Sequence, residues 1–489
     1  MIVTAIDEAV GLDCPAQCLR VFIVSDPAEI AKLPVSAAVA RLFERALGCS
    51  RFTGAAGESV EVVSCDGQGA DRYVAVGAGA QGAQELERAG ACAWRAAETT
   101  GARVLQLWMG SASVEAAASV AYGAAHAAYQ FHMRTTPSKP AERRSVEQIQ
   151  LVHSRRADVE TVWKAKAGLL HAVNLTRDLV SAPANQLTPA IFAERLTGLV
   201  ATGLEVEVLS EDELRRLGMG ALLAVGQGSA EESKVVVLSW HGADAHAAPL
   251  ALVGKGVCFD SGGLSIKPCE HMADMKWDMA GAAAIAGGML ALATRNAKVN
   301  VVGVLGLVEN MPDGAALRPG DVITTLSGKT VEVIDTDAEG RLVLSDLLAY
   351  AGRRFSPAAI IDLATLTGAV AIALADTHAG LFSNNDEIAS ALLSAGEKSG
   401  EALWRLPLAA GLRREIESPI ADLKNYGARE GGAISAALFL QEFVENRPWA
   451  HIDMAAMAWR SKNDPEKGAA GATGFGVRLI DRFAAGYEC

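Results

Sequence analysis

Three short polar segments of the chain contain residues that could carry out acid–base or metal chemistry. They span residues 254–268, 275–283 and 335–342. Their ionisable side chains include Lys255, Asp260, Lys267, Asp278, Asp335, Asp337, Glu339 and Arg341. Each segment lies at or near the end of a predicted strand or the start of a predicted helix, where ligands gather in α/β sheets.

A cluster of Asp260, Asp278, Asp337 and Glu339 would be unstable by itself, because like charges repel and burial adds a desolvation cost. Divalent metal ions remove this conflict, and two ions about 3.5–4 Å apart can share bridging carboxylates and activate a water. Oxygen ligands favour Mn²⁺, Mg²⁺ or Zn²⁺. Asp337 and Glu339 are two residues apart, so we expect extended backbone to point both to one side.

Histidine contributes little to this chemistry. Of the nine histidines only His271 is near these segments, between the first two, and there is no HExxH motif. The pattern therefore argues against a thermolysin-like site with a single zinc ion.

Each of these residues also has an ordinary structural interpretation. A single Asp near a strand end more often caps a helix or shapes a turn, and Asp278 could be the N-cap of an Ala-rich helix. Lys255 and Lys267 could be solvated lysines, and Arg341 could pair with a surface acid. The joint pattern of the three segments favours the metal site.

The elements that must position these segments alternate between strands and helices. In the second part of the chain, apolar runs predict strands at 235–240, 250–259, 300–308, 358–366 and 450–457, and 280–294 predicts a helix. Continuous apolar strands separated by helices indicate a largely parallel or mixed sheet with helices on both faces.

The first part shows the same alternation on a smaller scale. It predicts strands at 19–26, 72–79 and 103–110 and helices at 84–100 and 112–132. Two prolines and mixed charges at 134–144 indicate a connection, and a helix is expected through 163–180. We therefore predict an α/β protein with a smaller N-terminal α/β domain (1–150), a connecting helix (151–175) and a larger catalytic domain (176–489).

Charge and composition narrow the class of partner and compartment. The net charge of −13 argues against nucleic acid or an anionic membrane as the partner. The longest apolar stretch, 363–375, is too short to span a membrane, and the first residues lack the basic region of a secretory signal. The eight cysteines form no CxxC pair, so free thiols are expected, with Cys258 and Cys269 as packing residues. A cytoplasmic protein follows.

Beyond chemistry and composition, the sequence resembles the M17 leucyl aminopeptidase family. The three segments agree with that family in spacing, and TDAEGRL (336–342) resembles its signature octapeptide. Further matching runs are NLTRDLVSAPANQLTP (174–189), LATLTGA (363–369), LWRLPL (403–408), ADLKN (421–425), WAHIDMA (449–455) and GATGFGVRL (471–479). The resemblance covers roughly 165–489, whereas the first 150 residues match only in general character.

The resemblance implies a two-metal aminopeptidase that releases N-terminal residues, preferentially Leu and other apolar ones, by metal-activated water. Two divalent ions per subunit are implied, Mn²⁺ or Zn²⁺, with Co²⁺ or Mg²⁺ as alternatives. The tighter ion would be held by Lys255, Asp260, Asp278 and Glu339. The more exchangeable ion would be held by Asp260, Asp337 and Glu339, with the Asp337 carbonyl helping.

The same resemblance implies roles for the remaining residues and an assembly. Lys267 would stabilise the developing oxyanion, and Arg341 would hold a bicarbonate ion that acts as general base. Met275, Thr365 and the segment around Ala455 match positions that line the apolar S1 pocket. The family also implies a homohexamer, a dimer of trimers, acting on peptides with a free N-terminus.

One position departs from the family pattern. The octapeptide begins with Asn in the family, whereas this chain has Asp335. The residue is not one of the implied metal ligands, so the site should survive, while the added acid could change metal affinity or pH dependence.

Three alternative functions remain open at this point. Residues 77–82 form a GxGxxG after a predicted strand, but no acid follows the next strand, so a tight turn is favoured over an NAD site. A non-catalytic binding scaffold, including a DNA-binding one, is weakened by the acidic charge and the intact ligand positions. A two-metal phosphoesterase lacks an arginine cluster beyond Arg341.

Overall fold

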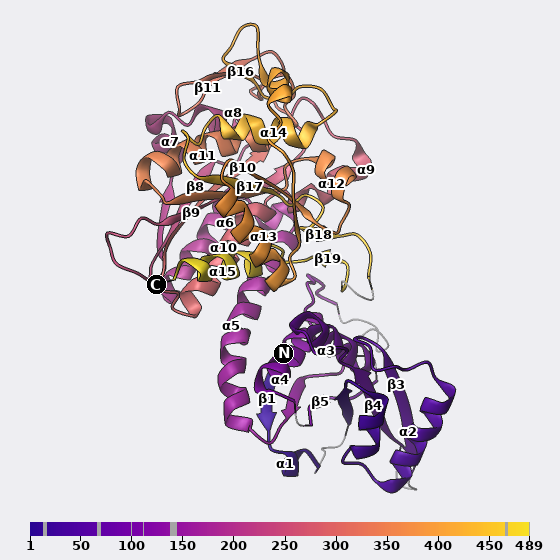
Figure 1. Cartoon of the computed structure of the whole chain (residues 1–489). Helices are drawn as coiled ribbons and strands as arrows, with labels where there is room; N and C mark the ends of the chain where they lie inside the picture. Colours follow the sequence, from indigo (N-terminus) through magenta and orange to yellow (C-terminus); the bar gives the residue numbers. More distant parts are fainter. Residues whose placement is uncertain are drawn as a thin grey trace. The chain divides into compact units, whose positions relative to one another are not determined.

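The computed structural model describes residues 1–12, 17–65, 70–98, 100–110, 112–136, 144–464 and 468–488. By its internal contacts the chain divides into two compact units (Figure 1). The N-terminal unit consists of Met1–Leu170 with Asn463–Ala469, and the C-terminal unit consists of His171–Lys462 with Ala470–Cys489.

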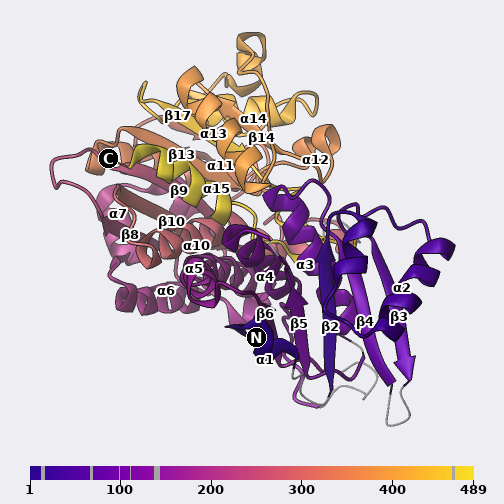
Figure 2. The same ribbon diagram turned by 60° about the horizontal axis from the view of Figure 1, so that its bottom comes forward.

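The N-terminal unit is built on a six-stranded sheet in the order β1-β6-β5-β2-β4-β3 (Figure 2). Neighbouring strands are parallel, except that β3 runs antiparallel to β4. The strands are β1 (Ile2–Ile6), β2 (Cys18–Val24), β3 (Ser59–Cys65), β4 (Ala70–Gly77), β5 (Val104–Trp108) and β6 (Gln148–Val152). The helices are α1 (Glu8–Leu12), η1 (Pro27–Lys32), α2 (Ala37–Cys49), α3 (Ala83–Ala97) and α4 (Val114–Ala127). The long α5 (Arg156–Ser181) begins in this unit and ends in the C-terminal unit.

Alternation along the strands explains why helices cover both faces of this sheet. Val21 belongs to one buried cluster together with Trp94 of α3 and Val120 of α4. Its neighbour Phe22 belongs to a second cluster with Phe43 of α2. Because successive side chains of a strand point to opposite faces, two apolar faces require two covering layers.

The C-terminal unit contains an eight-stranded sheet in the order β15-β14-β17-β13-β9-β10-β8-β7. The central strands β17, β13, β9 and β10 are parallel, and antiparallel pairs flank them on both sides. The strands are β7 (Glu205–Leu209), β8 (Lys234–His241), β9 (Leu250–Asp260), β10 (Asn300–Asn310), β13 (Ala359–Ala364), β14 (Ala379–Ser383), β15 (Leu403–Arg405) and β17 (Trp449–Asp453).

Helices cover both faces of the large sheet as well. In Figure 1, α8 (Gly220–Gly226), α11 (Gly340–Phe355) and α14 (Gly432–Gln441) lie on one side, and α10 (Ala280–Thr294), α13 (Asp386–Ser399) and α15 (Val477–Ala484) lie on the other. The remaining helices are η3 (Ala184–Gln186), α6 (Pro189–Thr197), η4 (Gly198–Thr202), α7 (Glu211–Leu217), α9 (Cys269–Met272), η5 (Ala273–Trp277), α12 (Gly368–Leu374), η6 (Ala410–Ile416) and η7 (Ala485–Tyr487).

Two small sheets complete the C-terminal unit. One joins β11 (Val322–Thr324), β12 (Thr330–Glu332) and β16 (Leu423–Lys424), and the other pairs β18 (Trp459–Arg460) with β19 (Gly471–Ala472). In the first, β12 and β16 are parallel, so the residues that follow each strand continue side by side.

Helix α10 packs directly on the centre of the large sheet. A Cβ atom at Gly254 of β9 would lie 2.7 Å from the Ala282 Cα, so only glycine allows this close approach. Among the described residues, one stretch, Ala273–Thr294, is long and apolar enough to cross a membrane, and 89% of its apolar window is buried within the protein.

The predicted α/β class with helices on both sheet faces is confirmed, and every predicted strand overlaps an observed one. The predicted helix at 163–180 lies within α5. The sequence did not predict β1, β3 and β6 of the N-terminal sheet or β7, β14 and β15 of the large sheet, and except for β3, which has 7 residues, these strands have 5 residues or fewer. Part of the predicted connection, 137–143, lies outside the described residues.

Candidate metal centre

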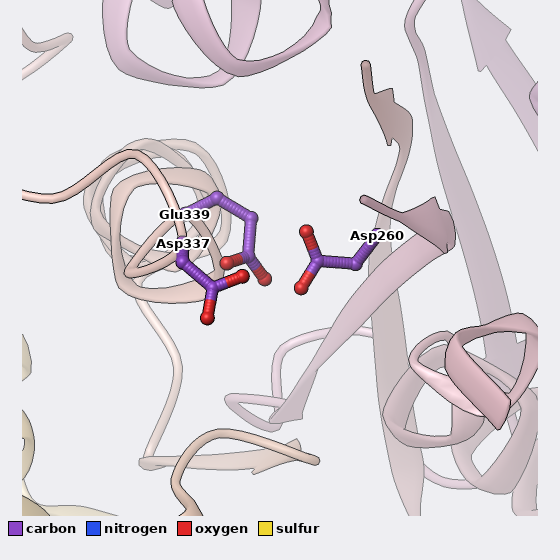
Figure 3. A group of neighbouring side chains, drawn as sticks. All are labelled: Asp260, Asp337 and Glu339. Carbon is purple, nitrogen blue, oxygen red and sulfur yellow. The ribbon is translucent and has the colours of Figure 1, made fainter. Parts of the chain in front are cut away.

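The large sheet and one helix start bring three carboxylates together. Asp260 is the last residue of β9, and Glu339 immediately precedes α11. One oxygen from each of Asp260, Asp337 and Glu339 lies within 4.8 Å of the others. Figure 3 shows Asp337 and Glu339 on one segment, with Asp260 pointing toward them from the opposite side.

The backbone that carries Asp337 and Glu339 differs from our expectation. Residues 336–337 form a turn, and Glu339 has φ −78° and ψ −37°, which is helical rather than extended. The prediction of an extended segment was therefore wrong. The two carboxylates converge because the turn reverses the chain just before α11 begins.

One buried lysine, Lys255, and one half-buried lysine, Lys267, balance these acids. The Lys255 Nζ lies 2.8 Å from Asp278 Oδ1 and 2.7 Å from Glu339 Oε1, and it donates to the Thr365 carbonyl at 2.9 Å. The Lys267 Nζ lies 2.8 Å from Asp260 Oδ2 and 2.5 Å from Asp337 Oδ1. All five predicted ligand positions are therefore adjacent in space.

The pKa values of the lysines follow from this balance. Burial by itself lowers the pKa of Lys255, but attraction to Asp278, Glu339 and Asp260 outweighs it and holds the pKa above the ordinary value. Burial also lowers the pKa of Lys267, but attraction to the neighbouring acids, Asp260 above all, outweighs burial and raises the pKa. Both side chains are ammonium ions in the metal-free centre.

The pKa values of the acids shift in opposite directions. Burial raises the pKa of Asp278 well above its ordinary value and that of Asp337 to about 7, with neighbouring carboxylates adding to the rise. For Glu339, burial would also raise the pKa, but Lys255 and Lys267 outweigh it and hold the pKa below its ordinary value. If all four carboxylates were ionised, they would carry two more charges than the two lysines neutralise, and a divalent cation would remove that excess.

The donor set fits hard divalent cations. The Asp278 side chain is buried, and its Oδ1 accepts from Lys255 and from the Thr365 hydroxyl at 2.8 Å. Its Oδ2 is buried without a hydrogen-bond partner among the described residues. A buried, unpartnered carboxylate oxygen beside three converging carboxylates could serve as a ligand for a hard divalent cation.

Asn310 is a site residue that the sequence reasoning missed. It ends β10 beside Asp260, and its Nδ2 donates to Asp260 Oδ1 at 2.8 Å and to the Thr336 carbonyl at 2.9 Å. It thus fixes the Asp260 carboxylate and ties β10 to the segment that carries Asp337. Its position just after the predicted strand 300–308 is the sequence feature that could have identified Asn310 as a site residue.

The loop after β9 returns Lys267 to the centre. Gly262 and Gly263 have φ values of +88° and +64°, and a Cβ at Gly262 would lie 2.7 Å from Asp337 Oδ1. Both glycines are needed because the loop turns tightly against the acids.

Arg341 is buried in the first turn of α11. Its Nη1 donates to the Asn425 carbonyl at 2.8 Å, and its Nε has no hydrogen-bond partner among the described residues. Burial lowers the pKa of this guanidinium, although Glu339 and other acids oppose the shift. A buried guanidinium with an unused donor is suited to a planar anion.

The three predicted pocket residues lie on separate elements of the C-terminal unit. Met275 is half-buried in η5, Thr365 follows β13, and Ala455 follows β17. Thr365 also holds Asp278 through its hydroxyl. Their role in binding a substrate side chain stays a prediction.

Asp335 shapes the turn that precedes Glu339. Its Oδ1 accepts a hydrogen bond from the Asp337 amide at 2.9 Å. An asparagine oxygen could accept the same bond, so the turn does not require the charge of Asp335.

The GxGxxG segment of the N-terminal unit, residues 77–82, is bound by a side chain of the helix that follows it. The Glu85 carboxylate accepts from the Gly82 amide at 3.0 Å, at the start of α3. An acid therefore occupies the helix end where a dinucleotide phosphate would have to bind, which supports the tight-turn interpretation.

The two cysteines that flank the first segment differ from one another. Cys258 is buried, and burial raises the pKa of its thiol well above the usual value, as expected for a packing residue. Cys269 is exposed, so its prediction as a packing residue was wrong.

Comparison with known proteins gives consistent matches over both units. The model of the cytosol aminopeptidase family catalytic domain matches residues 174–480, and that of the family's N-terminal domain matches 21–136. The first 150 residues were expected to match the family only in general character, whereas residues 21–136 match the model of its N-terminal domain.

Individual relatives cover most of the chain. A "probable cytosol aminopeptidase" of Caulobacter vibrioides is 52% identical and covers 90% of each chain. One of Nitrobacter winogradskyi is 46% identical over 91% of this chain and 90% of its own. Among solved structures, the "bottromycin maturation enzyme BotP in complex with Mn" superimposes with a TM-score of 0.83 at 36% identity, covering 97% of this chain and all of that chain.

Proposed function

This chain belongs to the cytosol aminopeptidase family of hydrolases, and from that premise we propose that it is a two-metal aminopeptidase. It removes N-terminal residues from peptides, with a preference for Leu and other apolar residues. The observation that carries the proposal is the convergence of Asp260, Asp337 and Glu339 within 4.8 Å, with Lys255 and Asp278 beside them.

The ligand assignment divides these residues between two ions. Lys255, Asp260, Asp278 and Glu339 hold the tighter ion, and Asp260, Asp337 and Glu339 hold the more exchangeable one, with the Asp337 carbonyl helping. The bound cations supply Lewis-acid activation of a water and of the scissile carbonyl. The unpartnered Oδ2 of Asp278 supports its place in this set.

Lys255 must lose its proton to act as a ligand. In the metal-free centre its ammonium balances Asp278 and Glu339. With divalent cations bound, Lys255 would be held as the neutral amine, since a nearby positive charge lowers the pKa of a lysine.

Lys267 and Arg341 assist the reaction as cations. Lys267 reaches both Asp260 and Asp337, which supports a role in which its ammonium would donate to the substrate oxygen as negative charge develops there. Arg341 holds a bicarbonate ion, which supplies a general base, and its unused Nε donor supports that role.

Substrate selection rests on the pocket residues and on the free amine. Met275, Thr365 and Ala455 line an apolar S1 pocket, and discrimination among apolar side chains is modest because one methylene changes binding by about 1–3 kcal/mol. The free N-terminus of the substrate selects exopeptidase over endopeptidase cleavage.

Metal identity, assembly and location complete the proposal. Mn²⁺ or Zn²⁺ is the native metal, with Co²⁺ or Mg²⁺ as substitutes, and the relative BotP bound Mn in its solved structure. The protein is a cytoplasmic homohexamer, a dimer of trimers, in which residues 1–150 serve assembly or regulation and 151–175 connect them to the catalytic domain at 176–489. Light scattering that shows a monomer at micromolar concentration would oppose this assembly.

Hydrolysis of leucine amide tests the reaction class. The protein is stripped with a chelator and assayed before and after addition of Mn²⁺ or Zn²⁺, with N-acetyl-leucine amide as the matched substrate without a free amine. We expect metal-dependent cleavage of the free amine alone. Cleavage of both substrates, or none with metal bound, contradicts the proposal.

A further inference from the structure

Asn425 lies directly behind the segment that carries two of the proposed metal ligands. It follows β16 in the chain and is completely buried, with an exposed fraction of 0%. β16 pairs in parallel with β12, so the residue that follows β16, Asn425, lies beside the irregular backbone that leads from β12 to α11. That backbone contains Asp337 and Glu339.

The side-chain amide of Asn425 uses all of its hydrogen-bonding capacity on this segment. Its Oδ1 accepts from the amides of Ile334 at 2.8 Å and Asp335 at 3.3 Å. Its Nδ2 donates to the carbonyls of Asp335 at 2.6 Å and Ala338 at 3.3 Å. An amide is the side chain that can both accept and donate in this way.

The backbone groups of Asn425 make two further hydrogen bonds, one before and one after the segment that its side chain contacts. Its amide donates to the Glu332 carbonyl at 3.0 Å, at the end of β12. Its carbonyl accepts from Arg341 Nη1 at 2.8 Å, in the first turn of α11. One residue therefore contacts the segment before, within and after the metal-ligand turn.

The turn depends on such contacts because it lacks a regular hydrogen-bond ladder. Buried backbone groups outside helices and sheets need side-chain partners. On the Asp260 side the partner is Asn310, which binds the Thr336 carbonyl. Asn425 provides the contacts to Ile334, Asp335 and Ala338.

We propose that Asn425 is a positioning residue of the metal centre, which sets the spacing of Asp337 and Glu339 and the orientation of Arg341. It touches neither metal nor substrate and acts through the backbone of 334–341. This inference rests on the proposed function, since it assigns Asn425 to the same centre.

The test compares Asn425→Ala with Asn300→Ala as a matched control. Asn300 is also buried and also joins loop backbone through its amide, accepting from Ala243 at 3.1 Å and donating to Asp244 at 2.7 Å and Ala247 at 3.2 Å. It lies at the opposite end of β10 from Asn310. Both variants lose buried hydrogen bonds, but only Asn425→Ala disturbs the turn at 336–337 that carries Asp337 and leads to Glu339.

Mn²⁺ titration of the full-length, chelator-treated protein, by calorimetry and by electron paramagnetic resonance, gives a readout independent of turnover. We expect Asn425→Ala to bind the more exchangeable Mn²⁺ about 10–100-fold more weakly, with an altered resonance spectrum, since groups that orient metal ligands have effects of that size. Asn300→Ala should bind Mn²⁺ like the wild type even if its thermal stability falls equally. If Asn425→Ala does not fold, the milder Asn425→Ser is measured in its place, with the same expectation of weaker binding.

Wild-type Mn²⁺ affinity in the folded Asn425 variant overturns this inference, and so does an equal loss of affinity in Asn300→Ala. The proposed function has a separate readout, because wild-type protein that binds Mn²⁺ without cleaving leucine amide contradicts the function and leaves the effect of Asn425 on binding measurable.

Discussion

Replacement of Lys255 by methionine isolates the electrostatic balance of the centre. The substitution keeps an unbranched side chain of similar length and removes the charge. Lys255 is only 2% exposed, and its Nζ lies 2.8 Å from Asp278 and 2.7 Å from Glu339. The variant would therefore leave two buried carboxylates facing each other without their cation.

The expected loss follows from these distances. At an effective dielectric constant of about 20, each contact contributes about 6 kcal/mol of Coulomb attraction, and desolvation of the ions offsets much of it. Removing one partner of a buried ion pair typically costs about 3–5 kcal/mol. We expect Lys255→Met to lose about that much stability in the metal-free protein.

Urea unfolding in the presence of chelator measures the loss. For a protein of this size, with m near 3 kcal/mol/M, the midpoint should fall by about 1 M or more. The difference should narrow at saturating Mn²⁺, because bound cations would then neutralise the remaining carboxylates.

Lys329→Met is the matched control. Lys329 likewise binds a carboxylate, Glu442 Oε2 at 2.7 Å, and a carbonyl at 2.9 Å, but it has one carboxylate partner where Lys255 has two, and its side chain is 37% exposed. Exposed ion pairs contribute about 0–1 kcal/mol, so its midpoint should hardly move. Equal midpoints for the two variants would refute the reasoning.

Four further changes test other parts of the centre and the fold. Asp337→Ala should reduce bound metal from two ions to one per subunit by elemental analysis, and retention of two ions with full activity would show that the ligand assignment is wrong. Lys267→Ala should lower kcat for leucine amide by about 10²–10³-fold with an unchanged circular dichroism spectrum, since it removes a donor to the developing oxyanion; an unchanged kcat contradicts that role. Asp335→Asn should keep the turn, because an amide oxygen can still accept from Asp337, and should weaken Mn²⁺ binding severalfold through the lost charge; tighter binding would contradict this. Burial raises the pKa of Glu401 to about 7 from an ordinary 4.5, although its carboxylate accepts from the amides of Gly476 and Leu479. The folded state therefore binds this proton more tightly than the unfolded state, so the stabilisation is complete below pH 4.5 and is lost as pH rises through 7, by about 3 kcal/mol. Glu401→Gln should lack this contribution in urea unfolding between pH 5 and pH 8, and an identical pH slope in both proteins would contradict the assignment.

The sequence by itself determined the α/β class and the segments that carry the chemistry. Apolar runs of strand length predicted the central strands, because a strand covered on both faces must be apolar throughout. The acids and lysines stood out because their types and spacing agree with a metal-binding family. Short edge strands such as β15 were missed, since three residues hold too little pattern to predict a strand.

Only the tertiary structure decided which groups meet. Lys255 contacts the carbonyl of Thr365, which is 110 residues away, and Asn425 binds Asp335 across 90 residues. The turn at 336–337 and the helical Glu339 replace the extended segment that local spacing suggested. Such contacts depend on sheet order and strand register, which bring distant strand ends to one edge, and local sequence pattern does not encode these distances.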